Sequence, residues 1–366
     1  MMSKLNLVVL LGGKSPEHNI SLISGNSVIN ALNKDKYDIT VVGIDKAGQW
    51  WLQDSRHYLN NSDDPGSISL VRAEIPVALD TDGTHSWLIN RHNNERIARI
   101  DVIFPVLHGA NGEDGVLQGC FRMANVAFVG VDVMASSVGM DKDMSKRLWR
   151  DAGIPIADFV IVDLSNRTAI KYDEVTDKLG LPLFVKPANA GSSVGVSKVV
   201  DEASFSYAMN EAFKYDRKVL IEEAVDGIEV ECAVLGNEHP EASVVGAIIP
   251  TETFYSYEAK YISSTGAKLM IPADIPENVS NDIRNTAIKA FKVIGGEGLS
   301  RVDFFLRADH TIVLNEINTL PGFTSISMYP KLWEASGLPY PELLDRLIAL
   351  ALSRHQQMQA LQMTHG

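Results

Sequence analysis

The chain has 366 residues, 45% of them hydrophobic, and a formal net charge of −13. This size and composition predict a folded protein of roughly two or three domains and argue against a disordered chain. The negative net charge argues against general binding to nucleic acids or anionic membranes, because those surfaces carry the same sign. We therefore expect small-molecule partners, with anionic ligands met by local groups of basic side chains.

Cysteine usage and the N-terminus indicate the cellular compartment. The two cysteines, Cys120 and Cys232, are far apart, which argues against a disulfide framework and a thiolate metal site. The apolar run at residues 5–11 is too short to span a membrane, and no cleavage site follows it. We expect a cytoplasmic protein that does not enter a membrane.

The N-terminal third alternates between strand-like and helix-like patterns. Residues 5–11 predict a strand, residues 22–32 a helix and residues 37–44 a second strand, an order typical of a βαβ unit. A polar, turn-rich segment at residues 55–94 is expected to be attached to this unit.

A fully apolar strand is expected over residues 101–107, with His108 at its C-terminal end. A glycine-rich loop at 109–115 and a further strand at 126–129 follow. Ligands of open α/β sheets bind at such strand ends, so His108 is a candidate for ligand contact. The alternative is that His108 caps the turn.

A second unit begins near Met140. The spacing of Met140, Met144 and Leu148 predicts a helix, which Gly153 and Pro155 end. Further strands are expected at 181–186, 218–222 and 229–235, with a hairpin over 301–318 and a polar tail after Ser353 that frays.

The hairpin carries a candidate metal site. A turn centred on Asp309-His310 places Asp303 opposite Glu316 and Arg301 opposite Asn318, all on one face of the sheet. Opposed carboxylates repel each other, and a divalent cation between them would remove the repulsion. Oxygen ligands without Cys or His favour Mg²⁺ or Mn²⁺ over Zn²⁺. The alternative is an edge hairpin with solvated acids, bridged by Arg301 in a surface salt bridge.

The glycine-rich segment 189–195 predicts a phosphate site, because glycines and serines let backbone N–H groups approach phosphate oxygens. The Walker A pattern is missing, so Lys142 and Lys186 are the candidates that neutralise phosphate. Lys186 ends an apolar strand, where an unpaired cation is costly, and we expect it to have an anionic partner. Glu222 and Glu223 end the next strand and are either adenine and ribose ligands or solvated acids.

Two further groups are open to two interpretations. Glu17, just beyond the first strand, either holds a substrate ammonium or lies in a solvated loop. Lys260 and Tyr261 belong to a tyrosine-rich stretch that either covers the site as a lid or packs against the sheet.

Taken in order, these segments resemble the D-alanine–D-alanine ligases of the ATP-grasp superfamily along the whole chain. The resemblance is carried by GGKSPEH at 12–18, HGANGEDG at 108–115, MDK at 140–142, VKPANAGSSVG at 185–195, EAKY at 258–261, RVD at 301–303 and NEINTLPGFTSIS at 315–327. Each motif alone is weak, and their shared order gives the match its specificity.

The resemblance implies an ATP-dependent joining of two D-alanines through a D-alanyl phosphate. The residues around the reacting substrates would be Glu17, His108, Ser192, Tyr261, Arg301 and Ser327. The ATP-binding residues would be Lys142, Lys186, Ser193, Glu222, Glu223, Val225, Glu229 and Lys260. Two Mg²⁺ ions, or Mn²⁺, would be held by Asp303, Glu316 and Asn318.

The resemblance also implies an α/β, ATP-grasp architecture and a homodimer. We expect an N-terminal Rossmann-like α/β domain at 1–138, a central lid domain at 139–228 and a C-terminal antiparallel-sheet α+β domain at 229–366. Relatives that make D-alanyl-D-lactate depart from the tyrosine of EAKY, so Tyr261 favours an amine acceptor. The alternative function is a D-alanine–D-serine or D-alanine–D-lactate ligase of the same fold.

Overall fold

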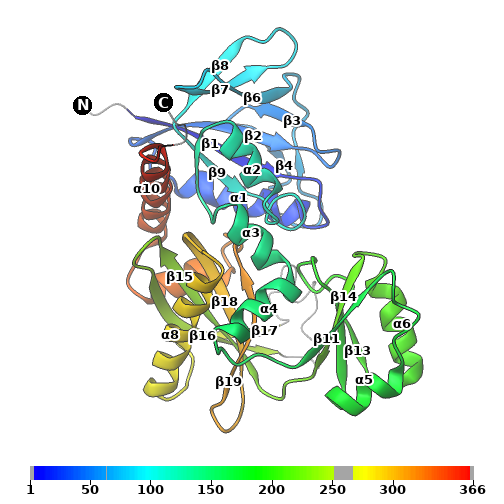
Figure 1. Cartoon of the computed structure of the whole chain (residues 1–366). Coiled ribbons are helices and arrows are strands. Elements are labelled where there is room, and N and C mark those ends of the chain that lie inside the picture. The colour runs from blue at the N-terminus through cyan, green and yellow to red at the C-terminus, as the bar shows by residue number, and fades with distance from the viewer. Residues whose placement is uncertain (1–3, 63, 251–266, 363–366) are drawn as a thin grey trace.

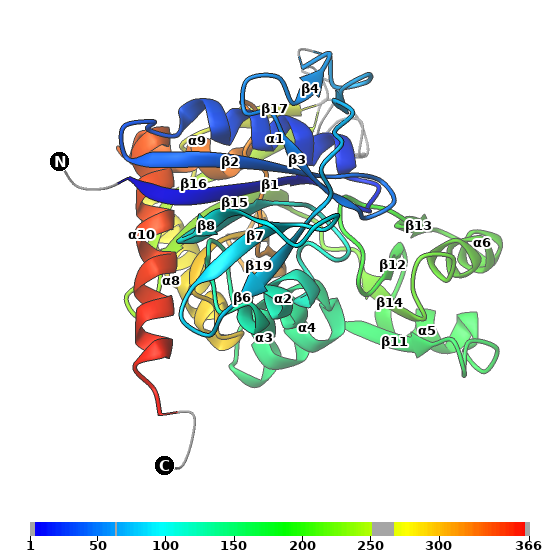
Figure 2. The same cartoon turned by 90° about the horizontal axis from the view of Figure 1, so that it is seen from above.

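The computed structural model describes residues 4–62, 64–250 and 267–362. Three larger sheets follow one another along the chain, coloured blue, green and yellow to orange in Figure 1. The central, green unit projects to one side of the other two, as the view from above shows (Figure 2).

The N-terminal sheet has the strand order β10-β9-β1-β2-β3. β1, β2, β9 and β10 are parallel, which confirms the predicted βαβ pattern. Its elements are β1 (Leu5–Gly12), α1 (His18–Ala31), β2 (Tyr37–Ile44), β3 (Trp50–Gln53), β9 (Val102–Val106), α2 (Val116–Met123) and β10 (Ala127–Phe128). Because Leu7 and Val9 pack with α1 while Val8 and Leu10 pack with α2, the two helices cover opposite faces.

The attached polar segment is more regular than the sequence suggested. It contains β4 (Leu59–Asn60), β5 (Ser69–Leu70), β6 (Val77–Thr81) and β7 (Ser86–Asn90), and β8 (Arg96–Ile100) follows. β6, β7 and β8 form a three-stranded sheet. Val77, Leu88 and Ile100 are buried against the same apolar cluster as Val8 and Leu10, so alternate residues of this small sheet cover one face of the larger one.

The predicted helix after Met140 is present, but its buried face differs from the one its apolar spacing suggests. α3 (Val133–Met140) and α4 (Lys142–Asp151) meet at Asp141, whose side chain caps α4. Met144 and Leu148 are 44% and 40% exposed, whereas Lys146 is 1% exposed. Polar residues face inward here because Lys146 pairs with Glu222 and Asp143 pairs with Lys218, both partners lying at residues 218–223.

The central sheet has the order β11-β14-β12-β13, and all its pairs are antiparallel. Its elements are β11 (Phe159–Asp163), α5 (Tyr172–Leu179), β12 (Leu183–Pro187), β13 (Ser197–Val199), α6 (Glu202–Ala212) and β14 (Lys218–Glu223). Val185, Phe205 and Ile221 lie in one buried cluster, which joins α6 to the sheet.

The C-terminal sheet has the order β17-β16-β15-β18-β19. Its elements are β15 (Ile228–Gly236), β16 (Glu241–Pro250), β17 (Ala267–Met270), α8 (Glu277–Val293), β18 (Gly298–Leu306), β19 (Ile312–Asn318), α9 (Met328–Ala335) and α10 (Tyr340–Gln359). Cys232 and Val234 pack with α8, while Ala233 and Leu235 pack with α9. Alternate residues therefore divide the sheet into an α8 face and an α9 face.

The prediction that the chain frays after Ser353 is wrong, because α10 continues to Gln359. Arg354 is 5% exposed and donates hydrogen bonds to the carbonyl oxygens of Gly130 (2.6 Å) and Phe128 (2.8 Å). Figure 1 shows α10 beside the N-terminal sheet. None of the described helices combines the length and apolar character that a membrane span requires.

Candidate active site

The hairpin of β18 and β19 has the predicted pairing at the candidate site residues. Arg301 lies opposite Asn318 and Asp303 opposite Glu316. The predicted turn centre is wrong, because Leu306 pairs with Ile312 and the turn is centred on Asp309. A register shift at Asn315, the extra residue of a β-bulge, compensates and restores the expected pairs.

The same register places three carboxylates in one row across the sheet. Glu231 of β15 lies opposite Asp303, which lies opposite Glu316. Asp303 is fully buried and Glu231 is 2% exposed, so the alternative of solvated edge acids is wrong for Asp303. Glu231 was missed by the sequence interpretation, although its spacing of two from Glu229 on a strand predicts a shared face.

Arg301 balances part of this negative charge. Its Nε and Nη2 donate to Asp303 Oδ1 (2.7 Å) and Oδ2 (2.6 Å), and its Nε lies 3.0 Å from Glu231 Oε2. Asn318 Nδ2 donates to Asp303 Oδ2 at 2.9 Å. Carboxylate oxygens of Glu229, Glu231 and Asp303 lie within 4.8 Å of one another. This set of hard oxygen donors fits Mg²⁺ or Mn²⁺, and it shares only Asp303 with the predicted ligands Asp303, Glu316 and Asn318.

A cavity of about 380 Å³ opens between the central and C-terminal sheets, a volume in the range of small-molecule sites. Nine of the candidate residues line it: Lys142, Lys186, Ser192, Ser193, Glu222, Glu223, Val225, Glu229 and Glu316. They come from α4, β12, β14, β15, β19 and the loops that follow β12 and β14. The fold thus brings together residues from three of the sequence motifs, those at 140–142, 185–195 and 315–327.

Cations and carboxylates alternate around this cavity. Lys142 Nζ donates to Ala190 O at 2.7 Å and lies 3.7 Å from Glu316 Oε2. Lys186 has the predicted anionic partner, which is the carboxylate of Glu222. Burial alone would lower the pKa of Lys186. The charge and hydrogen bond of Glu222, together with the charges of Glu316 and Glu229, outweigh burial and raise that pKa above its usual value.

The same Glu222 carboxylate also contacts Lys146, which the sequence interpretation missed. Despite burial, which disfavours its charge, the two lysines hold the pKa of Glu222 below its usual range. The alternative of a solvated Glu222 is therefore wrong. Glu223 lies at the rim and accepts a hydrogen bond from Asp158 N at 3.1 Å.

A second group of candidates meets at the C-terminal ends of β1 and β9. Ser192 Oγ donates a hydrogen bond to the carboxylate of Glu17. Glu17 is 7% exposed, so it does not lie in a solvated loop. Gly109 leaves room for this carboxylate, because a Cβ atom there would lie 2.4 Å from Glu17 Oε2.

His108 is buried next to this group. Its Nδ1 lies 3.2 Å from Leu320 O and 3.7 Å from Glu113 Oε1, and its Nε2 lies 3.3 Å from Ser24 Oγ. Burial would lower the pKa of His108, but Glu113 and Glu17 outweigh it and raise the pKa. Glu113 was not singled out from the sequence.

A narrow recess of about 30 Å³ lies beside the larger cavity, a volume that holds about one water molecule. Lys142, Gly191 and Glu316 line both spaces, and Glu113 and Asn318 line the recess. The recess therefore adjoins the lysine-lined cavity and reaches Glu113, the carboxylate beside His108.

Three candidate residues, Ser327, Lys260 and Tyr261, are not assigned to these groups. Ser327 Oγ accepts a hydrogen bond from Thr324 N at 2.9 Å, at the start of α9. Lys260 and Tyr261 lie outside the described residues, so the predicted lid is not tested.

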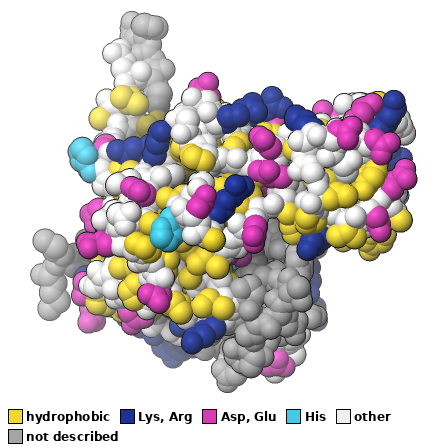
Figure 3. Space-filling view, turned by 90° about the horizontal axis from the view of Figure 1, so that it is seen from below, with side chains coloured by type: hydrophobic (Ala, Val, Ile, Leu, Met, Phe, Trp, Pro, Cys, Tyr) yellow, Lys and Arg dark blue, Asp and Glu magenta, His cyan; other side chains and the backbone are white. Residues whose placement is uncertain are grey.

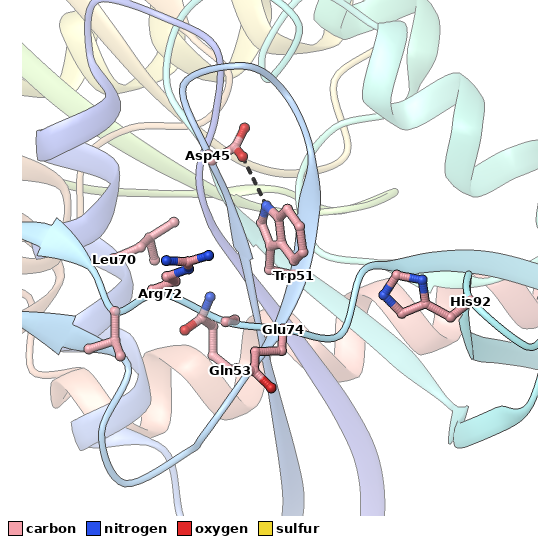
Figure 4. A pocket seen from close by; sticks show the side chains of 9 residues that line it. Asp45, Trp51, Gln53, Leu70, Arg72, Glu74 and His92 are labelled. Atoms are coloured by element: carbon pink, nitrogen blue, oxygen red, sulfur yellow. Dashed lines mark hydrogen bonds between the residues drawn. The ribbon is translucent and has the colours of Figure 1, made fainter.

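Another cavity, of about 560 Å³, lies on the N-terminal unit and is shown in Figure 4. Trp51 projects into it, and its Nε1 donates to Asp45 Oδ2 at 2.9 Å. None of the candidate residues in the described part of the chain lines this cavity. Among the described residues on the face seen in Figure 3, basic side chains are interspersed with acidic and apolar ones.

Comparisons with known proteins agree with this geometry. The family profile described as "D-ala D-ala ligase N-terminus" matches residues 6–131, and the one described as "D-ala D-ala ligase C-terminus" matches residues 148–349. D-alanine--D-alanine ligase A of Salmonella typhimurium is 52% identical over 364 residues, covering 99% of this chain and 100% of its own length. The D-alanine--D-alanine ligase of Shouchella clausii is 50% identical and covers 97% of both chains.

Solved structures give the same result. The D-alanine-D-alanine ligase from Coxiella burnetii has a TM-score of 0.83 at 39% identity, covering 98% of this chain and 97% of its own. The VanG D-Ala:D-Ser ligase from Enterococcus faecalis has a TM-score of 0.83 at 36% identity, covering 95% and 100%. The three sheets, the cavity between two of them and these matches together show that the chain belongs to the D-alanine–D-alanine ligase family and has its ATP-grasp fold.

Proposed function

We propose that the chain joins two D-alanine molecules into D-alanyl-D-alanine while ATP is converted to ADP and phosphate. The observation that carries this proposal is the cavity in which lysines, carboxylates and serines from separate motifs meet. Relatives at 50% and 52% identity over nearly the whole chain bear the name of this reaction. The dipeptide would serve peptidoglycan precursor synthesis.

ATP would occupy this cavity. Lys142, Lys186 and Ser193 would contact its phosphates, while Glu222, Glu223, Val225 and Glu229 would contact adenine and ribose. Lys260 would add a further phosphate contact. Two Mg²⁺ ions held by Asp303, Glu316 and Asn318 would supply positive charge to the transferring phosphoryl group.

Glu17 would hold the ammonium of the first D-alanine. Its carboxylate is already oriented by Ser192, and the second carboxylate nearby, Glu113, keeps His108 in place. The carboxylate of this D-alanine then attacks the γ-phosphorus of ATP, which forms D-alanyl phosphate and releases ADP.

The amine of the second D-alanine then attacks the acyl carbon, and phosphate leaves. Arg301 would stabilise the oxyanion of the tetrahedral intermediate, and Ser327 would bind the carboxylate of the second D-alanine. Because water would hydrolyse the acyl phosphate, we propose that the segment with Lys260 and Tyr261 closes the site beforehand.

The second substrate, which accepts the D-alanyl group, distinguishes this function from that of a D-alanine–D-serine or D-alanine–D-lactate ligase. ADP release is measured at neutral pH with D-alanine alone and with D-alanine plus D-serine or D-lactate, and the products are identified by mass spectrometry. We expect D-alanine-stimulated ADP release with D-alanyl-D-alanine as the main product. A preference for D-serine, the acceptor in the name of the VanG structure, or for D-lactate would overturn the assignment.

We further propose that the protein is a cytoplasmic homodimer with domains at 1–138, 139–228 and 229–366. The strands of the three larger sheets support this division, because they occupy residues 5–128, 159–223 and 228–318. Sedimentation velocity of the purified protein tests the dimer.

A further inference from the structure

Lys146 is a buried cation for which the proposed reaction has no use. It follows Lys142 by one turn of α4, so the two side chains share a face of the helix. Lys142 lines the nucleotide cavity, whereas Lys146 is 1% exposed and does not. Burying an ammonium group is costly unless a partner compensates, so a lysine at this position requires an explanation.

The partner of Lys146 is shared with Lys186. Glu222 is 2% exposed, and its Oε1 contacts Lys146 Nζ while its Oε2 accepts a hydrogen bond from Lys186 Nζ. The contact with Lys146 is a buried ion pair. One carboxylate therefore faces two ammonium groups, and the three side chains together carry one positive charge.

We infer that Lys146 is a positioning residue that neutralises Glu222 and so leaves the charge of Lys186 available to the phosphates of a nucleotide. This inference rests on the proposed ATP-binding function. Without Lys146, Glu222 and Lys186 would form a closed neutral pair, and attraction inside a protein is strong enough to hold such a pair together. An incoming phosphate would then have to separate Lys186 from Glu222.

The directions of the pKa shifts of the two lysines agree with a structural role for Lys146 and a ligand-binding role for Lys186. Burial and the neighbouring Lys186 lower the pKa of Lys146, and the attraction of Glu222 offsets only part of that decrease. The pKa of Lys186 is instead raised, because Glu222, Glu316 and Glu229 together outweigh its burial. Lys186 is thus the more firmly charged lysine, and it is the one that lines the cavity.

The test is equilibrium binding of nucleotides to the full-length protein, without Mg²⁺ and without D-alanine. In Lys146→Met we expect the Kd for ATP to rise about tenfold or more, since one charge-assisted contact is weakened. The Kd for adenosine, measured by displacement of a fluorescent ATP analogue, should change by less than about twofold. Arg147→Met is the matched control, because Arg147 is the next residue of the same helix and 51% of its side chain is exposed.

A double-mutant cycle separates a charge effect from a packing effect. In a Glu222→Gln background there is no carboxylate to neutralise, so Lys146→Met should alter the Kd for ATP by less than about twofold. The inference would be overturned if Lys146→Met weakened ATP binding equally in the wild-type and Glu222→Gln backgrounds. It would also be overturned if the substitution weakened the binding of ATP and of adenosine equally. If Lys146→Met does not fold, Lys146→Gln, which removes the charge but keeps a polar group, is compared in the same way.

ATP binding by the wild-type protein tests the proposed function, and ATP binding by Lys146→Met tests the role of Lys146. A wild-type chain that does not bind ATP would reject the proposed function itself. Unchanged ATP binding in Lys146→Met, beside ATP binding by the wild type, would reject only the role given to Lys146.

Discussion

Arg301 holds Asp303 through two hydrogen bonds, from Nε to Oδ1 at 2.7 Å and from Nη2 to Oδ2 at 2.6 Å. The two residues are two positions apart on β18, so their side chains leave the same face of the sheet. Asp303 is fully buried, and its charge is therefore balanced within the protein before any ligand arrives. A guanidinium fixed in this way needs little reorganisation when negative charge develops beside it.

Asp303→Asn should reduce Mg²⁺-dependent ADP release by at least about a hundredfold, because the metal loses a charged ligand and Arg301 loses its bidentate partner. The measurement is the initial rate of ADP release as a function of Mg²⁺ concentration. Asp309→Asn is the control, since Asp309 lies at the turn of the same hairpin and should keep nearly full activity. Normal turnover in Asp303→Asn would contradict the metal assignment.

Glu17→Gln should raise the KM for the first D-alanine about ten- to hundredfold, because a carboxylate–ammonium contact is replaced by a neutral one. The KM for ATP should stay close to the wild-type value, since Glu17 does not line the nucleotide cavity. Steady-state kinetics with each substrate varied in turn provide both numbers. Glu95→Gln, an exposed position just before β8, is the control. An equal rise in both KM values would indicate a general structural defect instead.

The ion pair of His108 with Glu113 should contribute stability that depends on pH. The folded protein raises the pKa of His108 above its usual value of 6.5. The contribution is therefore complete below pH 6.5 and is lost as pH rises through the folded pKa. Urea unfolding of wild type and Glu113→Gln between about pH 5.5 and pH 9 measures it. The difference in the free energy of unfolding should shrink toward high pH, and a difference that grows instead would contradict a raised pKa of His108.

Arg354→Met should lower the free energy of unfolding by about 2–4 kcal/mol, because two buried carbonyl oxygens lose their charged donor. Arg346→Met on the same helix is the control, since Arg346 forms an ion pair with the exposed Glu241 and should cost less than about 1 kcal/mol. Urea unfolding followed by circular dichroism compares the two variants. Equal decreases in the free energy of unfolding for the two variants would show that the contacts of Arg354 with the N-terminal sheet add little stability.

The sequence predicted the pairing of Asp303 with Glu316 because the period of a strand fixes which side chains share a face. It could not predict the bulge at Asn315 or the shifted centre of the turn, since both depend on backbone conformations that many sequences permit. The two deviations cancel, so the predicted pair is present although the predicted turn centre is wrong.

The missed residues are charged side chains whose partners become apparent only in the folded chain. Lys146 lies in a helix whose apolar spacing points to Met144 and Leu148, yet those two side chains face solvent. The buried face is set by Glu222, which is distant in sequence and meets Lys146 only in the folded chain. Hydrophobic periodicity carries no information about such partners.

The position of α10 has a consequence for biosynthesis. Leu343, Leu347 and Ala351 belong to the same buried cluster as Leu7 and Val9 of the first strand. A ribosome releases the N-terminal strands long before it has made this helix, so the nascent sheet emerges with one apolar surface incompletely covered. The first unit therefore stays incompletely covered until α10 has been synthesised, and chaperones can bind the exposed surface in that interval.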